Sequence, residues 1–280
     1  RGLGDVYKRQ KLVAIDIDAT LINDQRQITP KTKEALEAAK QQGVKVVLCT
    51  GRPMTGVNAY LTELGLNHQD DEYVISFNGA LAQSTNERVL VNYTLSFDDY
   101  IDWQSFCTKN NVKSQFESRD YIYTTNRDLS PWTIHESDLV SMPVRVRSLD
   151  EMAHTQDQYV LAKGMMLGDK EELNQVQTKF IKEFGDRFTV IRSEDFYLEI
   201  INHRASKGST LKALSEELGI KQDKVMSLGN AQNDNSMIEY AGIGVAMGNA
   251  VPETKAVADV ITDTNNNDGV GKAVEKYVLR

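Results

Sequence analysis

Cysteine is scarce in this sequence, where Cys49 and Cys107 are the only two among 280 residues. Two cysteines supply neither a disulfide framework nor a metal-spaced cysteine cluster, so we expect a protein of the reducing cytoplasm. Long apolar runs are absent too: none approaches the roughly 18 residues of a membrane span. No apolar signal-peptide segment precedes the first predicted strand. The sequence therefore predicts neither a transmembrane helix nor secretion.

Positive charge is also in short supply. The chain has 32 Lys and Arg against 40 Asp and Glu, which gives a net charge of -8 and a pI near 5.2. Nucleic acids and anionic membranes attract basic surfaces, so we expect neither as a partner. An anionic small-molecule substrate would have to be held by local groups.

The first ten residues, RGLGDVYKRQ, include no initiator Met and show no regular periodicity. We interpret residues 1–10 as a non-native leader and leave them out of the fold prediction. The remaining chain is long enough for a large core, or for one core domain with a substantial insertion.

Apolar runs alternate with helical patterns in two parts of the chain, 11–84 and 202–280. Such alternation is typical of β-α-β crossovers, so we predict a doubly wound parallel α/β sheet of the Rossmann-like kind, covered on both faces. Between these parts, residues 85–201 mix strand-like and helical pieces less regularly and contain most of the aromatic residues. We predict that this segment is an inserted α+β domain.

Two carboxylates, Asp16 and Asp18, directly follow the apolar run Leu12–Ile15. Residues i and i+2 of a strand face the same side, so two negative charges lie close together unless a cation or a shared proton separates them. This favours a chemical role. The same pattern also occurs in solvated turns and helix caps, so the pair alone leaves both interpretations open.

Three further polar segments fall at or near the predicted carboxyl ends of strands, where ligands of open parallel sheets collect. Thr50-Gly51-Arg52 offers a hydroxyl and a backbone N–H to an anion, although Thr50 could instead cap a helix. Segment 229–234 offers side-chain oxygens to a hard cation, or forms a turn in which Asp234 caps the next helix.

The third segment is Ser206-Lys207-Gly208, at the start of a predicted helix. A cation at a helix N-terminus opposes the macrodipole, which favours an anion bound beside Lys207. For the same reason we expect Lys207→Ala to leave the stability of the ligand-free protein unchanged or slightly higher. The alternative is an ordinary lysine on the solvated surface.

Taken in order, the motifs D-x-D-x-T, T-G-R-P, K-G and G-x-x-x-N-D resemble the haloacid dehalogenase (HAD) superfamily. The narrower similarity is to the Cof-type hydrolases, and among them to the YidA-type sugar phosphatases. It extends from about Lys11 to the C-terminus and includes the longer stretches 77–80, 123–127, 133–137 and 236–241. Each motif is weak alone, but four in this order are specific.

The resemblance implies a Mg²⁺-dependent phosphatase of small phosphate esters, sugar phosphates in particular. Asp16 would be the nucleophile that forms an aspartyl-phosphate, and Asp18 would protonate the leaving alkoxide and then activate water. Mg²⁺ would be bound by Asp16, the Asp18 carbonyl and Asn230. The phosphoryl group would be held by Ile17, Thr50, Gly51, Lys207 and Asn233, while Asp234 would orient Lys207 or the metal-bound waters.

The resemblance also implies that the insert, 85–201, is a cap that closes over the site and selects the leaving group. Asn78, His135, Glu136 and Glu199 are the candidates for contacts with the substrate. They have simpler interpretations as well. Asn78-Gly79 is a turn signal, and a histidine in a mixed segment is more often structural.

Two residues depart from the family pattern. Ala19 stands where family members usually have Gly; at a positive φ this alanine would cost about 1 kcal/mol, and at a negative φ almost nothing. Asn230 stands at the position of the family's metal-binding Asp. A neutral amide oxygen would then replace a carboxylate, so the affinity for Mg²⁺ should fall.

These departures keep two functions open. The favoured one is an active Mg²⁺-dependent phosphatase, because the nucleophile, the acid/base, the lysine and the threonine are all present. The alternative is a phospho-ligand-binding homologue whose catalysis is weak or lost because of Asn230 and Ala19.

Overall fold

The computed structural model describes residues 10–279, and the predicted leader lies outside this range except for Gln10, which is buried. The chain forms two compact units. Of the described residues, the first unit comprises 10–51, 58–92 and 206–279, and the second comprises 52–57 and 93–205.

The first unit is built on a sheet that has eight strands within the described residues, in the order β14-β13-β12-β1-β2-β3-β4-β5. The strands from β14 to β3 run parallel, and β4 and β5 extend the sheet antiparallel. This confirms the predicted doubly wound α/β sheet. The strands are β1 Leu12–Ile15, β2 Lys45–Cys49, β3 Tyr73–Ser76, β4 Leu81–Ser84, β5 Val89–Asn92, β12 Val225–Gly229, β13 Ile243–Ala246 and β14 Val260–Ile261.

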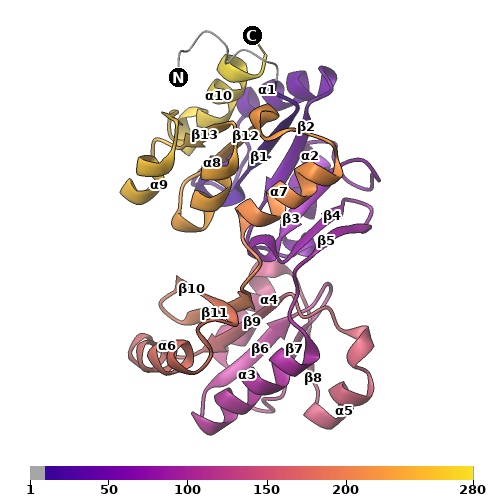
Figure 1. Cartoon of the computed structure of the whole chain (residues 1–280), viewed down its shortest axis with the longest axis vertical. Helices are drawn as coiled ribbons and strands as arrows, with labels where there is room; N and C mark the ends of the chain where they lie inside the picture. The colour runs from indigo at the N-terminus through magenta and orange to yellow at the C-terminus, as the bar shows by residue number, and fades with distance from the viewer. Residues whose placement is uncertain (1–9, 280) are drawn as a thin grey trace. The chain divides into compact units, whose positions relative to one another are not determined.

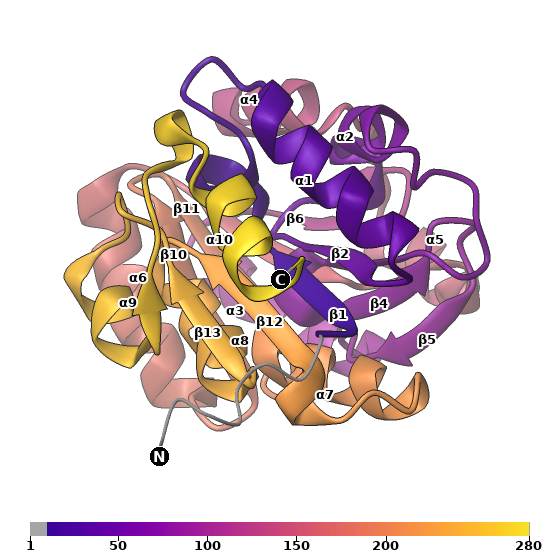
Figure 2. The same cartoon turned by 90° about the horizontal axis from the view of Figure 1, so that it is seen from above.

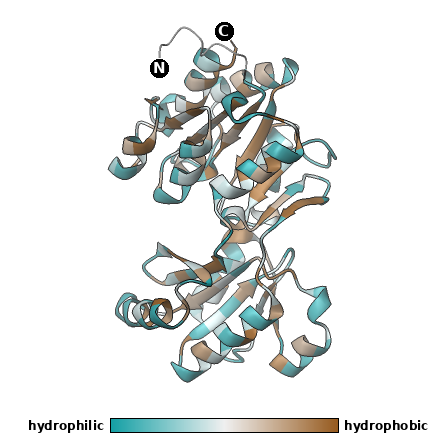
Figure 3. Cartoon of the chain, viewed as in Figure 1, coloured by the Kyte–Doolittle hydropathy of each residue, from teal (hydrophilic) through white to brown (hydrophobic). Residues whose placement is uncertain are grey.

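Helices cover both faces of this sheet, which explains why its central strands read as continuous apolar runs. Helices α1 and α10 pack together on one face, and α7 and α8 pack together on the other (Figures 1 and 2). Every residue of β1 is fully buried, and the central strands carry the hydrophobic colours in Figure 3. The helices are α1 Pro30–Gln41, α2 Asn58–Glu63, α7 Lys207–Glu217, α8 Asn235–Tyr240, α9 Pro252–Val257 and α10 Gly269–Tyr277.

The second unit has a six-stranded sheet in the order β10-β11-β9-β6-β7-β8. One face of it packs on α3 and α6 around an aromatic core that includes Trp103, Phe116 and Phe180. The strands are β6 Lys113–Glu117, β7 Ile122–Thr124, β8 Val144–Val146, β9 Lys163–Leu167, β10 Phe188–Glu194 and β11 Tyr197–Asn202. The helices are α3 Phe97–Lys109, α4 Pro131–Val140, α5 Leu149–His154 and α6 Lys170–Phe184.

The insert was predicted to start at residue 85, within the sequence that forms the β4–β5 hairpin. In the structure β5 pairs with β4, so the sheet of the first unit continues to Asn92. The pairing satisfies backbone groups that would otherwise be open along β4. Within residues 10–279 no helix combines the length and the apolar character that crossing a bilayer requires.

Candidate active site

The polar segments predicted from the sequence converge in the first unit. Four neighbouring strands, in the order β12, β1, β2 and β3, run parallel and therefore end at the same edge of the sheet. Because β1 is flanked by β2 on one side and β12 on the other, this edge is a topological switch point, where ligands of such sheets bind. The loops here carry the Asp pair, Thr50 with Gly51, and segment 229–234.

Lys207, the first residue of α7, lies between two carboxylates. Its Nζ is 2.7 Å from Asp16 Oδ1 and 2.6 Å from Asp234 Oδ1, and the lysine is only 1% exposed. The interpretation of Lys207 as a solvated surface residue is therefore wrong. The helix-dipole mismatch is compensated by the two carboxylates, whose attraction for the ammonium exceeds the few tenths of a kcal/mol that the dipole costs.

The charges of this trio set the protonation of the proposed nucleophile. Burial, with the Asp234 carboxylate adding to it, raises the pKa of Asp16 to about 7, while the Lys207 ammonium opposes the rise. Burial works against the charge on Lys207, but the two carboxylates outweigh it and raise the lysine's pKa, so Lys207 remains charged. Asp234 therefore positions Lys207, which in turn binds Asp16. The second carboxylate oxygen of Asp234, Oδ2, accepts hydrogen bonds from the backbone N–H groups of Asn230 and Ala231 at 2.9 and 3.1 Å.

The burial of Lys207 reverses the stability effect that the sequence suggested for its removal. Lys207→Ala should destabilise the protein by about 3–5 kcal/mol, because two buried carboxylates lose their shared cation. Urea unfolding measures this. Lys272 is the matched control, since it also contacts a carboxylate, Asp263, at 2.7 Å but is 42% exposed. Lys272→Ala should lower stability far less, because exposed ion pairs contribute little. Equal losses at the two sites would contradict this account.

After Asp16 the chain forms a tight turn, Ile17–Leu21, in which Asp18 is exposed to solvent. Within it Ala19 has φ +56°, a left-handed conformation that favours glycine. The alternative in which Ala19 is nearly harmless therefore does not apply. The Ala19 carbonyl accepts a hydrogen bond from Asn249 Nδ2 at 2.8 Å, which helps hold the turn in place.

Because of this φ, Ala19→Gly should raise the free energy of unfolding by about 1 kcal/mol. Urea unfolding monitored by circular dichroism provides the measurement. Ala38→Gly, in the regular helix α1, is a control of opposite sign and should lower stability by about 1 kcal/mol. If both substitutions lower stability, Ala19 does not carry the strain that its φ indicates.

The candidate metal ligands lie together beside Asp16. One terminal atom of the Asn230 side-chain amide points toward three oxygens. It is 3.0 Å from Thr20 Oγ1, 3.1 Å from Asp16 Oδ2 and 3.0 Å from the Asp18 carbonyl oxygen. Oxygens bound side by side to an octahedral Mg²⁺ are about 2.9 Å apart, so the spacing fits this ion. The charge of the proposed ligand set is less favourable for Mg²⁺. Asp16 supplies a carboxylate, whereas the Asp18 carbonyl and Asn230 are neutral. Within residues 10–279 no set of three or more His, Cys, Asp or Glu side chains is grouped to hold a metal.

The proposed phosphate-binding residues surround the same edge. Thr50 is buried, and it caps neither the 3₁₀ turn Met54–Gly56, which has Pro53 at its N-cap, nor α2. Asn78 also lies here, in the first unit, where it accepts a hydrogen bond from Asn233 Nδ2 at 3.1 Å. The prediction grouped Asn78 with the insert, and the structure corrects this. Asn78 lies against Gly51 of the first unit, so closely that a Cβ added at Gly51 would be 3.1 Å from the Asn78 amide.

The turn that carries Asn78 is tightly constrained. Phe77, Asn78 and Gly79 have φ values of 51°, 54° and 97°, three left-handed residues in a row. A Cβ at Gly79 would lie 2.2 Å from the carbonyl oxygen of Ser206, so only glycine lets this turn approach the start of α7. The Asn-Gly pair is thus both a turn, as one interpretation held, and part of the site.

Two of the candidates in the second unit, Glu136 and Glu199, lie beside Lys163, a residue that was not predicted from the sequence. Lys163 Nζ lies 3.2 Å from Glu117, 3.7 Å from Glu136 and 3.3 Å from Glu199, and all four residues are buried. Burial, only partly offset by Lys163, raises the pKa of Glu117 well above its usual value. His135 contacts Tyr197 Oη through Nδ1 at 2.9 Å.

Sequence signals existed for this cluster and for Thr20. Lys163 is the one charged residue of β9, whose other residues are glycine or apolar, and it faces Glu117 in the β6–β9 pairing. Thr20 is the last residue of the D-x-D-x-T motif but was given no role. Its side chain contacts Asn230 at 3.0 Å.

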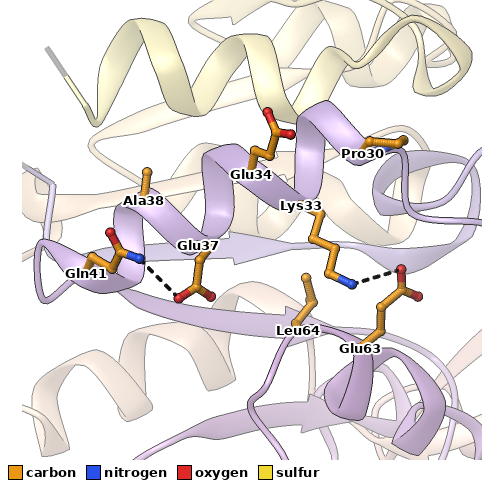
Figure 4. Close-up of a pocket in the computed structure, with 8 residues that line it drawn as sticks. All are labelled: Pro30, Lys33, Glu34, Glu37, Ala38, Gln41, Glu63 and Leu64. Carbon is orange, nitrogen blue, oxygen red and sulfur yellow. Dashed lines mark hydrogen bonds and ion pairs between the residues drawn. The ribbon is translucent and has the colours of Figure 1, made fainter.

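A surface pocket elsewhere in the first unit does not suit a phosphate ester. It lies between α1 and the end of α2, and its lining includes Glu34, Glu37 and Glu63 (Figure 4). Lys33 is 3.8 Å from Glu63, and Gln41 donates to Glu37 at 3.5 Å. The carboxylates outnumber the cation, so an anionic ligand would be repelled.

Comparison with known proteins agrees with the motifs. Residues 13–274 match the family model described as haloacid dehalogenase-like hydrolase. The chain is 41% identical over 270 residues to the Bacillus subtilis protein named "Putative phosphatase YxeH", covering 96% of this chain and 98% of that protein. It is also 30% identical over 271 residues to 5-amino-6-(5-phospho-D-ribitylamino)uracil phosphatase YcsE of the same species, covering 96% of each.

Solved structures show the same fold. A haloacid dehalogenase-like hydrolase from Bacteroides thetaiotaomicron has a TM-score of 0.84 at 30% identity, over 96% of this chain and 99% of that one. The HAD subclass IIB sugar phosphatase BT4131 has a TM-score of 0.76 at 26% identity, over 96% and 100%. These matches define a hydrolase built on a doubly wound parallel sheet. The chain belongs to the haloacid dehalogenase-like hydrolase family, which confirms the resemblance seen in its motifs.

Proposed function

We propose that this phosphatase hydrolyses small phosphate esters, sugar phosphates among them, with Mg²⁺ as its cofactor and through an aspartyl-phosphate intermediate. The observation that carries the proposal is the position of Asp16 at the carboxyl end of β1, with Oδ1 bound by Lys207 and Oδ2 directed toward Asn230. A carboxylate fixed at both oxygens by donors or a cation is oriented for attack and loses little freedom when it reacts.

In the proposed reaction Asp16 attacks phosphorus, and the bond from phosphorus to the ester oxygen breaks. Asp18, which is exposed on the turn after the nucleophile, protonates the leaving alkoxide. It then takes a proton from the water that attacks the aspartyl-phosphate, which releases inorganic phosphate and restores Asp16. The Lys207 ammonium, the Thr50 hydroxyl and backbone N–H groups of the loops stabilise the phosphoryl oxygens throughout.

Asp16, the Asp18 carbonyl and Asn230 would hold Mg²⁺, which when bound supplies positive charge to the phosphoryl oxygens. The distances from the Asn230 amide to the other two groups support this assignment. The neutral Asn230 points to weaker binding than a carboxylate would give. Millimolar Mg²⁺ should therefore be needed for full activity.

The insert is proposed to select the leaving group, as expected for a cap domain. Glu136 and Glu199 both pair with Lys163 inside the second unit, so a substitution at either would also disturb that cluster. His135 is exposed and is the better candidate for direct contact with a substrate. A cytoplasmic location is likewise a proposal, supported by two cysteines that are buried and unpaired.

The alternative function is binding of a phospho-ligand without efficient hydrolysis, and the left-handed Ala19 together with Asn230 is what favours it. Turnover of a panel of phosphate esters, with Mg²⁺ titrated into the millimolar range, distinguishes the two. We expect Mg²⁺-dependent release of phosphate, fastest from sugar phosphates. Binding of inorganic phosphate with no release from any ester would support the alternative instead.

A further inference from the structure

The side-chain amide of Asn230 lies among three oxygens, and its orientation decides what it does there. An amide presents either its oxygen or its nitrogen when it turns by 180° about its last bond. With the oxygen inward, it accepts from the Thr20 hydroxyl at 3.0 Å. It then also faces the Asp18 carbonyl and the Asp16 carboxylate, and neither the carbonyl nor an ionised carboxylate has a proton to offer.

With the nitrogen inward, the amide brings two hydrogens to a site lined by acceptors. Nδ2 is then 3.1 Å from Asp16 Oδ2, 3.0 Å from the Asp18 carbonyl oxygen and 3.0 Å from Thr20 Oγ1. The carboxylate of Asp16 is thereby bound on both sides, by Lys207 at Oδ1 and by the amide at Oδ2. In the absence of metal this orientation is favoured, because it replaces repulsion between oxygens with hydrogen bonds.

We infer that Asn230 is a built-in substitute for the metal ion: without metal its amide nitrogen donates to Asp16 and Asp18, and a divalent cation binds only when the amide turns its oxygen inward. The inference rests on the proposed function for the location of the metal site. The inference adds that the site has two states, one with the amide nitrogen inward and one with the amide oxygen inward. An aspartate at position 230 could not form the first state, because an ionised carboxylate has no hydrogen to donate.

The first test is the stability of Asn230→Ala in EDTA, where the two orientations predict opposite signs. If the nitrogen faces inward, the substitution removes hydrogen bonds from Asp16 and Asp18, and the melting temperature should fall by several degrees. If the oxygen faces inward, the substitution relieves repulsion, and the melting temperature should stay the same or rise. That second result would overturn the inference.

The matched control is Asn249→Ala. Asn249 donates to the Ala19 carbonyl at 2.8 Å and accepts from the Asn265 N–H at 3.0 Å, so it supports the same turn. It is exposed, and neither of these bonds involves Asp16 or Asp18. Its substitution should lower the melting temperature less than Asn230→Ala does. Equal losses would show that any contact to this turn has the same effect, and would contradict the inference.

The second test measures binding of Mg²⁺ itself, by calorimetry and by the shift of melting temperature. Asn230→Asp should lower the melting temperature in EDTA and should bind Mg²⁺ about tenfold or more tightly than the parent, because a charged ligand replaces an amide that must first turn. An unchanged or weaker affinity for Mg²⁺ would overturn the inference. Asn249→Asp adds the same charge at the neighbouring exposed site and should change the affinity much less.

A third measurement covers the case in which a variant does not fold. In the parent protein the Asn230 side-chain NH₂ should give a protected pair of NMR signals in EDTA, and added Mg²⁺ should shift them and make them exchange faster with water. Signals that do not respond to Mg²⁺ would contradict the inference. None of these measurements requires turnover, so failure of the phosphatase assay and failure of this inference are separate results.

Discussion

Asp16→Asn should abolish hydrolysis of every phosphate ester that the parent protein cleaves. The substitution is nearly isosteric and leaves no carboxylate to attack phosphorus, so no aspartyl-phosphate can form. It also removes a negative ligand from the proposed metal site. The fold should persist, because Lys207 keeps its contact with Asp234 at 2.6 Å. Steady-state phosphate release measures the loss, with circular dichroism to confirm folding.

Asp223→Asn provides the matched control for that experiment. Asp223 is an exposed carboxylate of the same unit, on a short 3₁₀ turn before β12, and its substitution should leave the rate unchanged. Turnover by Asp16→Asn at even a few per cent of the parent rate would indicate another nucleophile. In that case the role given to Asp16 would be wrong.

Asp18→Asn should reduce the hydrolysis of alkyl phosphates by about 10²- to 10⁴-fold, the usual contribution of general acid–base catalysis. The side chain is exposed on the turn after the nucleophile, and the backbone carbonyl that faces Asn230 remains. Binding of Mg²⁺ should therefore change little, which separates this variant from Asp16→Asn.

The leaving group offers an internal control for Asp18. An aryl phosphate such as p-nitrophenyl phosphate leaves without much help from an acid, so Asp18→Asn should slow its first step far less than that of a sugar phosphate. A loss below tenfold for an alkyl ester, or the same loss for both esters, would contradict the acid role.

The sheet and the order of the site segments were predictable because their signals are local. Apolar runs such as Leu12–Ile15 are buried on both faces, and Thr29-Pro30 and Gly43 mark the ends of α1 as helix-start and helix-stop residues. The topology then fixes which loops meet, since parallel neighbours end at one edge of the sheet. For this reason Asp16, Thr50 and Asn230 could be grouped from the sequence.

What the sequence could not give are the properties that depend on partners distant in the chain. Lys207 is buried because Asp16, 191 residues away, meets it across the fold, so the helix-dipole rule and the buried ion pairs predict opposite effects of its removal on stability. Lys163 was missed for the same reason, because its partners Glu117, Glu136 and Glu199 come from three separate elements. The sign of φ at Ala19 likewise depends on how the turn is held, and it remained conditional until the structure was known.

The most direct test of the central claim is to find the phosphoryl group on the protein during turnover. The parent protein would be mixed with a sugar phosphate and Mg²⁺, quenched in acid within milliseconds, digested and mapped by mass spectrometry. We expect phosphate on the peptide that contains Asp16, and none when Asp16→Asn is treated in the same way. Turnover accompanied by phosphate on a different residue, or by no phosphorylated peptide at all, would contradict catalysis through an Asp16 aspartyl-phosphate.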